Sequence, residues 1–194
     1  MDDANVLEKR ENIGSDNEKA HNSLLVELKA RVDELERVRK TIESMAAKRT
    51  EILKQTDTYF KVRKGRLKLR EIEGSSEVAL IYYVREDVAR PKKSNVLILT
   101  FRKPMAVSLK RMLKKALATK VVVTKVREVY HYRGIHIHLD TVKSLGTFVE
   151  FEKSVSRKQV KNARSHLEKL LQRLGIDEKS LERASYGDLA FKRA

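Results

Sequence analysis

Residues 120–153 carry the pattern that most limits how this chain can fold. Three runs within this stretch, 121–132, 135–140 and 148–152, alternate apolar with polar side chains, and glycine-containing breaks separate them. Successive side chains of a strand point to opposite faces, so each run has one apolar face and one charged face. Glycine between such runs predicts turns. The stretch is therefore expected to form three antiparallel strands with an apolar side and a charged side.

The charged side of these strands carries both signs. The alternation places on it Lys125, Arg127, His136, His138, Asp140, Glu150 and Glu152. For a single antiparallel sheet the ordinary interpretation of such a face is that it lies in water. Recurrence of the same pattern along the chain would argue instead that the charged faces meet.

The same alternation recurs in three earlier segments, at residues 24–31, 66–70 and 80–85. Their charged faces, combined with the first set, give the cations Lys29, Arg31, Arg66, Lys68, Arg70, Arg85, Lys125 and Arg127 and the carboxylates Glu27, Asp140, Glu150 and Glu152. Three cations on one strand face, as in residues 66–70, repel one another unless an anion lies between them. The recurrence indicates several strands of one design.

Three amphipathic segments predict helices. They begin near Asp33, with Glu36 as a capping partner, near Ser108, and at a capping pair formed by Ser156 and Gln159. Amphipathic helices need an apolar surface to cover, so we expect them outside a curved sheet whose charged faces point inward. The predicted fold class is α+β, with a charged lumen enclosed by strands.

Length and composition limit the domain organisation. A chain of 194 residues suits one domain, which we place at residues 23–194, after a polar tail of mixed charge at residues 1–22 that is expected to be disordered. Cysteine is absent, which excludes disulfides and thiolate metal sites and suits a cytoplasmic protein. No apolar run reaches the roughly 18 residues of a membrane-spanning helix, so no membrane partner is expected.

The formal net charge of +16 implies an anionic partner. A lumen with surplus cations suits a polyanion such as a nucleoside triphosphate or another linear triphosphate, and clustered carboxylates suit Mg²⁺ or Mn²⁺. Nucleic acid fits the charge as well. The sequence argues against it, because no aromatic-rich RNA-binding strand, GxxG loop or recognition-helix pattern is present.

The chain resembles the CYTH-domain proteins, a family of triphosphate tunnel metalloenzymes that includes class IV adenylate cyclases and thiamine triphosphatases. The resemblance runs from about Leu24 to Leu189. Its blocks are QTDTYF (55–60), GRLKLRE (65–71), LIYYVR (80–85), KVREVY (125–130), IHLD (137–140) and LGTFVEFE (145–152), and they are closest to the cyclase branch. The resemblance implies a closed antiparallel barrel of about eight strands, crossed by a triphosphate.

The resemblance also implies roles for the charged side chains. Glu27, Asp140, Glu150 and Glu152 would hold metal, and the triphosphate would be bound by Lys29, Arg66, Lys68, Arg70, Arg85, Lys125 and Arg127. Of these cations, Lys29, Lys125 and Arg127 are the catalytic candidates, because they would neutralise charge developing on the phosphates. One departure stands out: the family opens with Glu-x-Glu-x-Lys, and its first glutamate is Leu25 here.

Three activities follow from the resemblance. The first is a metal-dependent conversion of ATP to cyclic AMP and pyrophosphate. The second is hydrolysis of tripolyphosphate, thiamine triphosphate or a nucleotide. The third, motivated by Leu25, is binding of a triphosphate or polyphosphate without turnover. A homodimer is compatible with the sequence.

Histidine and tyrosine side chains are assigned structural roles. For His136 and His138, hydrogen bonding within the tunnel is favoured over a zinc pair, because no third nitrogen or sulfur ligand accompanies them. For Tyr59, Tyr83 and Tyr186, core packing is favoured over contact with a nucleoside base.

Overall fold

The alternating segments all form strands. The computed structural model describes residues 18–193. Its strands are β1 (Glu18–Arg31), β2 (Lys48–Phe60), β3 (Arg66–Ile72), β4 (Glu77–Arg85), β5 (Lys92–Arg102), β6 (Thr119–Tyr132), β7 (Ile135–Val142) and β8 (Gly146–Ser154). Since β1 begins at Glu18, the predicted tail is wrong for residues 18–22, which are strand. Residues 1–17 of that tail lie outside the described residues.

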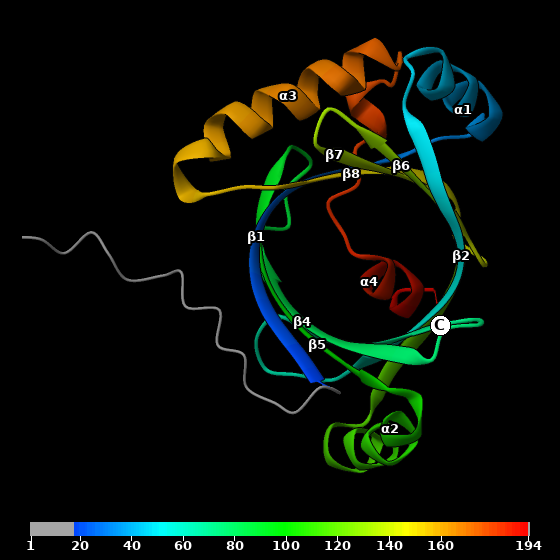
Figure 1. The fold of residues 1–194 in the computed structure, drawn as a ribbon, viewed down its shortest axis with the longest axis vertical. Coiled ribbons are helices and arrows are strands. Elements are labelled where there is room, and N and C mark those ends of the chain that lie inside the picture. The colour runs from blue at the N-terminus through cyan, green and yellow to red at the C-terminus, as the bar shows by residue number, and fades with distance from the viewer. Residues whose placement is uncertain (1–17, 194) are drawn as a thin grey trace, which may run out of the picture.

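The eight strands close into one antiparallel barrel, in the order β1-β5-β4-β3-β2-β6-β7-β8 (Figure 1). Closure is made by the pairing of β8 with β1, which sets Lys29 opposite Glu150. The hairpin between β2 and β3 turns at Gly65, whose φ is +71° and where a Cβ would lie 2.7 Å from the Tyr83 carbonyl oxygen. Only glycine fits this turn without strain. The predicted closed barrel is confirmed.

Four α-helices and two single 3-10 turns complete the described chain. The helices are α1 (Leu35–Ser44), α2 (Lys103–Leu117), α3 (Val160–Arg173) and α4 (Tyr186–Phe191), and the 3-10 turns are η1 (Arg157–Gln159) and η2 (Glu178–Ser180). The predicted start near Ser108 is wrong, because α2 begins five residues earlier and has Pro104 in its first turn. Proline suits that position, where its missing N–H has no helical partner.

The capping predictions had mixed outcomes. The pair that precedes α3 is confirmed, since the Ser156 N–H donates to Gln159 Oε1 at 2.9 Å. The pair predicted near Asp33 is wrong: the N-cap of α1 is Glu34, and no side-chain hydrogen bond caps this helix. None of the helices within residues 18–193 is long and apolar enough to cross a membrane.

The apolar strand faces pack outward against the helices. One cluster joins α1 and α3 to the outer faces of β1, β7 and β8, and includes Leu28, Ile137, Phe151 and Leu167. A second cluster places α2 against Phe60, Leu69 and Phe101. Figure 1 shows α3 and α1 on one side of the ring and α2 on the other. The charged faces are thereby left pointing into the lumen, as predicted.

The outer face of β6 is an exception to this covering. Val122 and Val126 are 52% and 42% exposed, so the expectation that helices cover the apolar strand faces is wrong there. The short helix α4 differs from the other three, because it lies within the ring of strands in Figure 1. Its Tyr186 packs with Tyr59, Val123 and Phe148, which are buried side chains of the strands around it.

Candidate functional site

The barrel lumen holds a cavity of about 120 Å³, and half of the residues that line it are charged. Six of the seven cations predicted to bind a triphosphate line it: Lys29, Lys68, Arg70, Arg85, Lys125 and Arg127. The seventh, Arg66, pairs instead with Asp188 of α4 at 2.8 Å and with Asp87 at 2.7 Å. Three of the four predicted carboxylates, Glu27, Glu150 and Glu152, also line the cavity.

On one wall, Asp57 of β2 holds two cations of β3; we call these three residues the Asp57 clamp. Strand register sets Asp57 opposite Arg70, whose Nε and Nη2 donate to the two carboxylate oxygens at 2.8 and 2.9 Å. Lys68 donates to Oδ2 at 2.8 Å. Burial disfavours the ionised carboxylate, but the charges of Arg70 and Lys68 outweigh it and hold the pKa of Asp57 well below its usual range.

Within the clamp, the negative charge of Asp57 stabilises the protonated form of Lys68 less than that of Arg70. Burial, together with the neighbouring Arg70, lowers the pKa of Lys68 to about 8. Asp57 was not assigned a role from the sequence. Its position in QTDTYF, beside a strand with three cations on one face, was the signal for an internal anion that those cations require.

Asp140, a predicted metal ligand, is fully buried and surrounded by donors. Arg127 donates to both carboxylate oxygens at 2.7 and 2.6 Å, the Tyr186 hydroxyl donates at 2.7 Å, and Lys125 Nζ lies at 3.5 Å. Burial opposes its ionisation, but the positive charges of Arg127 and Lys125 keep the pKa of Asp140 below its ordinary value. In this arrangement Asp140 orients two predicted phosphate ligands.

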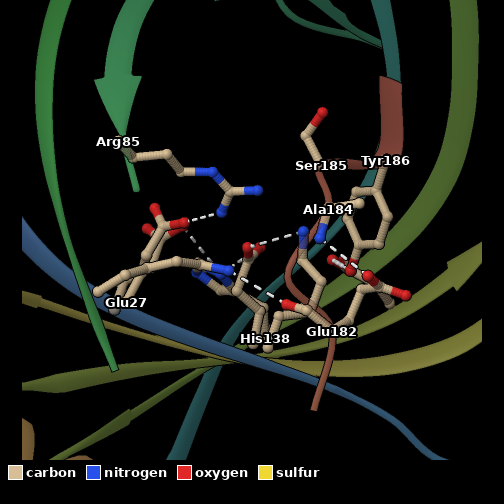
Figure 2. A network of polar contacts seen from close by, with 12 residues as sticks. Glu27, Arg85, His138, Glu182, Ala184, Ser185 and Tyr186 are labelled. Carbon is tan, nitrogen blue, oxygen red and sulfur yellow. Dashed lines mark hydrogen bonds and ion pairs between the residues drawn. The ribbon is translucent and has the colours of Figure 1, made fainter. Parts of the chain in front are cut away.

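On the opposite wall, three acidic side chains and an imidazole project from neighbouring strands; we call Glu27, His138, Glu150 and Glu152 the acidic wall. Glu27 forms an ion pair with Arg85, and Figure 2 shows these two side chains pointing toward each other. Glu150 accepts from Arg127 at 2.6 Å and lies 3.4 Å from Lys29 Nζ. No cation in residues 18–193 forms a comparable pair with Glu152.

The ionisation of the acidic wall follows this pairing. Burial disfavours the charged form of Glu150, but Lys29 and Arg127 hold its pKa well below the ordinary value. Burial and the adjacent charge of Glu150 raise the pKa of Glu152 to about 7. Burial, reinforced by Arg127, lowers the pKa of His138 well below its usual range, so its imidazole is neutral at pH 7.

Part of the acidic wall has the arrangement of a metal site. One ligand atom each of His138, Glu150 and Glu152 lies within 4.8 Å of the other two. The Nδ1 atom of His138 is buried, with no hydrogen-bond partner among the described residues. Carboxylate oxygens and an unshared imidazole nitrogen are donors that divalent cations accept, so the residues present fit such an ion.

The C-terminal segment enters the lumen from one end. Leu181 bridges to Ala30 of β1, and residues 182–186 continue past the acidic wall, as Figure 2 shows. Lys29 Nζ lies 3.8 Å above the centre of the Tyr186 ring. Asp188 pairs with Lys120 at 2.7 Å in addition to Arg66. Tyr186 is therefore a lumen residue that touches predicted phosphate and metal ligands, and the core-packing interpretation is incomplete for it.

Sequence reasoning missed one buried cation of the lumen. Lys92 faces Glu27 across β5 and β1, and its Nζ donates to the carbonyl oxygens of Glu182 and Arg183 at 3.1 and 3.2 Å. Burial, with Arg85 nearby, lowers the pKa of Lys92 to about 8. Pro91 directly precedes this lysine, and proline is typical of a loop. The signal that could have placed Lys92 in the lumen is strand alternation, because Lys92 and Ser94 are buried and Lys93 and Asn95 between and after them are exposed.

These features define a class of protein: a closed antiparallel barrel whose lumen is lined by six cations and by a carboxylate-rich wall. The CYTH domain matches residues 24–186, and the chain belongs to this family. No curated protein sequence matches the chain significantly.

Several solved structures share the fold. The PH1012 protein of Pyrococcus horikoshii is 24% identical, with a TM-score of 0.72, and the match covers 85% of this chain and 98% of PH1012. A candidate adenylate cyclase of Vibrio parahaemolyticus is 20% identical, with a TM-score of 0.70 and coverages of 90% and 100%. The adenylyl cyclase candidate HpAC1 of Hippeastrum, described as having a dominant triphosphatase activity, is 14% identical, with a TM-score of 0.61 and coverages of 88% and 95%.

Proposed function

We propose that this protein is a metal-dependent enzyme that binds a linear triphosphate in the barrel lumen and breaks one of its phosphorus–oxygen bonds. The observation that carries the proposal is the composition of the lumen, where six predicted phosphate ligands face a wall with three carboxylates. Phosphoryl transfer asks the protein chiefly for positioning and for positive charge around the phosphates. A cytoplasmic location, where nucleotides and Mg²⁺ are abundant, belongs to the proposal.

Each group of residues has a separate task in this proposal. Lys68 and Arg70 of the Asp57 clamp, with Lys125, bind phosphate oxygens, and Asp57 holds the first two in place. Lys29 and Arg127 both pair with Glu150 of the acidic wall, and in this proposal they neutralise charge that develops as the bond breaks. Arg66 joins the phosphate ligands when Asp188 releases it.

The metal is held by Glu150 and Glu152, with Glu27 and Asp140 as further proposed carboxylate ligands and Mg²⁺ or Mn²⁺ as the expected ion. When bound, such an ion supplies Lewis-acid polarisation and charge neutralisation at phosphate oxygens. Both are ion-paired in the structure, Glu27 with Arg85 and Asp140 with Arg127, so each would become a ligand only after giving up that guanidinium.

Hydrolysis is the reaction that the lumen supports best, because beyond the triphosphate and the metal ion it needs only a water molecule as the attacking group. Water attacks the terminal phosphorus, the bond to the bridging oxygen breaks, and the remaining diphosphate leaves with that oxygen. The attacked group, with the water oxygen, becomes orthophosphate, and one proton is released. The description of the Hippeastrum relative supports this reaction. Cyclisation of ATP is the second candidate, supported by the name of the Vibrio relative. In that reaction the 3′-hydroxyl attacks the α-phosphorus and pyrophosphate leaves.

A panel of substrates with product identification tests the proposal. Tripolyphosphate, thiamine triphosphate, ATP and GTP are incubated with Mg²⁺ or Mn²⁺, and orthophosphate, pyrophosphate and cyclic AMP are quantified separately. Glu150→Ala and Glu152→Ala are each expected to reduce turnover by about 100-fold or more, since they remove charge-positioning groups. Glu168→Ala, on the outer surface of α3, is the matched control and retains the wild-type rate.

Two outcomes contradict the enzymatic proposal. Rates that are unaffected in both lumen variants exclude this wall as the active site. Binding of tripolyphosphate without turnover, under every metal condition, identifies the protein as a triphosphate or polyphosphate binder, the alternative that Leu25 raises.

A further inference from the structure

His138 is a buried lumen side chain with a polar atom that the proposed reaction does not use. It lies on β7 directly opposite Glu150 of β8 and is only 5% exposed. Its Nδ1 has no hydrogen-bond partner among residues 18–193. A buried polar atom without a partner is uncommon, because its desolvation is not compensated.

This atom points at two carboxylates. Nδ1 is 4.0 Å from Glu150 Oε2 and 3.9 Å from Glu152 Oε1, too far for hydrogen bonds. Ligand atoms around one tetrahedral ion at bonds of about 2.1 Å lie roughly 3.4 Å apart. The two distances from Nδ1 therefore shorten by about half an ångström to reach a common ion. The three ligand atoms all lie within 4.8 Å of one another, so no separation shortens by more than about 1.4 Å, which side-chain torsions can supply.

We propose that His138 is a nitrogen ligand of a metal site completed by Glu150 and Glu152, and that this site prefers Mn²⁺ and Zn²⁺ to Mg²⁺. The inference deepens the proposed function by naming the metal class of the same lumen. Imidazole suits zinc and other transition metals, whereas Mg²⁺ takes oxygen ligands and retains several waters.

The strand order explains why the ligand comes from β7. Leu25 removes a carboxylate from β1, and Glu27, the remaining one, is held by Arg85. Because β8 lies between β1 and β7, a side chain on β7 can approach its carboxylates from the other side. His138 occupies that position and replaces an oxygen ligand by a nitrogen.

The ion pairs of the acidic wall permit this site. Glu152 has no close cation to displace within the described chain. Glu150 accepts one hydrogen bond from Arg127, but that guanidinium also makes two to Asp140 and stays anchored when Glu150 turns away. Lys29 is 3.4 Å from the other oxygen of Glu150, so one oxygen remains neutralised while the second binds metal.

Metal titrations of the full chain without any triphosphate test the site. Mn²⁺, Zn²⁺ and Mg²⁺ affinities are measured by calorimetry for the wild type, His138→Ala and the control His166→Ala, which changes an exposed histidine of α3. We expect Mn²⁺ and Zn²⁺ to bind the wild type at least about ten times more tightly than Mg²⁺. His138→Ala is expected to weaken both by about tenfold or more and leave Mg²⁺ within about twofold.

A spectroscopic measurement on the wild type covers the case in which His138→Ala does not fold. Zn²⁺ binding is expected to shift the ¹⁵N resonance of His138 Nδ1 and to leave that of His166, on the surface of α3, unchanged. An unshifted His138 at saturation overturns the inference. So does a variant in which all three metals weaken equally.

The two proposals fail separately. A protein that binds Mn²⁺ through His138 without turning over any triphosphate retains this metal site and loses the proposed activity. A protein that turns over triphosphates with Mg²⁺ as readily as with Mn²⁺, and whose metal affinities are unchanged in His138→Ala, retains the activity and loses this site.

Discussion

The two walls of the lumen solve the problem of buried charge in opposite ways. In the Asp57 clamp one carboxylate serves two cations, and all three groups are within hydrogen-bond distance. On the acidic wall three carboxylates share the available cations, and Glu152 and the Nδ1 of His138 remain without close partners in the described residues. The clamp is thus completed by the chain itself, whereas the acidic wall still has unused donor atoms.

This difference separates a structural task from a ligand-binding task. Buried ions that are paired and hydrogen-bonded are tolerated, and removing one partner is costly. A wall with unpaired donors is less stable alone and gains most from a bound cation. We therefore expect mutations in the clamp to affect folding most and mutations in the acidic wall to affect metal binding most.

The largest expected effect comes from Asp57→Asn. The change preserves shape but leaves Lys68 and Arg70 without a negative partner, and breaking a buried pair costs about 3 to 5 kcal/mol of unfolding free energy. Urea denaturation monitored by circular dichroism measures it. Glu73→Gln, which breaks the exposed pair with Lys54, serves as a control and is expected to cost less than about 1 kcal/mol. Equal effects of the two variants would remove the distinction between clamp and surface pairs.

A pH effect of Lys68 comes next. Its folded pKa of about 8 lies below the ordinary lysine value of 10.5, so between these two pH values the unfolded chain binds more protons than the folded chain. Unfolding free energy therefore rises with pH across this window, by roughly 3 kcal/mol from this residue.

Lys68→Met isolates that contribution. The difference in unfolding free energy between the wild type and the variant is expected to change between pH 8 and 10.5 and to be constant from pH 6 to 7. If this difference in unfolding free energy stays constant from pH 6 to 10.5, Lys68 keeps its proton in the folded state across that range. Asp57 would then compensate the charges of Lys68 and Arg70 equally.

Tyr186→Phe tests the link between α4 and the acidic side of the lumen. The variant loses the 2.7 Å hydrogen bond to Asp140 and keeps the ring beneath Lys29. Hydrogen bonds to charged groups contribute about 1.5 to 3 kcal/mol, and we expect a loss near 1.5 in urea denaturation. Tyr132→Phe, which removes an exposed bond from Arg173, is the control. No difference between the two would indicate that α4 docks through its apolar contacts alone.

The sequence predicted the barrel well because strand alternation is local. Residues such as Lys29, Lys125 and Glu150 could be assigned to the lumen from the parity of their positions alone. The helix starts were less certain, because no side-chain cap marks the start of α1 and α2 begins one residue before Pro104, a residue type that often ends a helix.

The site was predicted less completely, because pairing across the lumen depends on register and closure. Nothing local indicates that Asp57 faces Arg70, that Tyr186 returns to Asp140, or that Glu27 meets Arg85. His138 is the clearest case. Its residue type and its position on the charged face could be read from the sequence. The other two proposed ligands, Glu150 and Glu152, lie on another strand, and only the approach of all three side chains distinguishes a metal ligand from a tunnel hydrogen-bond donor.

The smallest expected effect concerns Leu25→Glu, which adds to β1 the carboxylate that the acidic wall lacks. Leu25 already lines the cavity, so the new side chain faces Glu27 and Glu152 without refolding the strand. We expect Mg²⁺ affinity, measured by calorimetry, to rise by about tenfold, because an all-oxygen set suits that ion, and Mn²⁺ affinity to change less.

Leu25→Gln separates charge from polarity in this experiment and is expected to leave Mg²⁺ affinity near the wild-type value. If Leu25→Glu weakens Mg²⁺ instead, repulsion among four carboxylates exceeds the gain of a ligand, and the acidic wall is already at its limit of negative charge. In that case the two walls would resemble each other more than their ion pairs suggest. Both would have a complete set of partners, one through Asp57 and the other through His138.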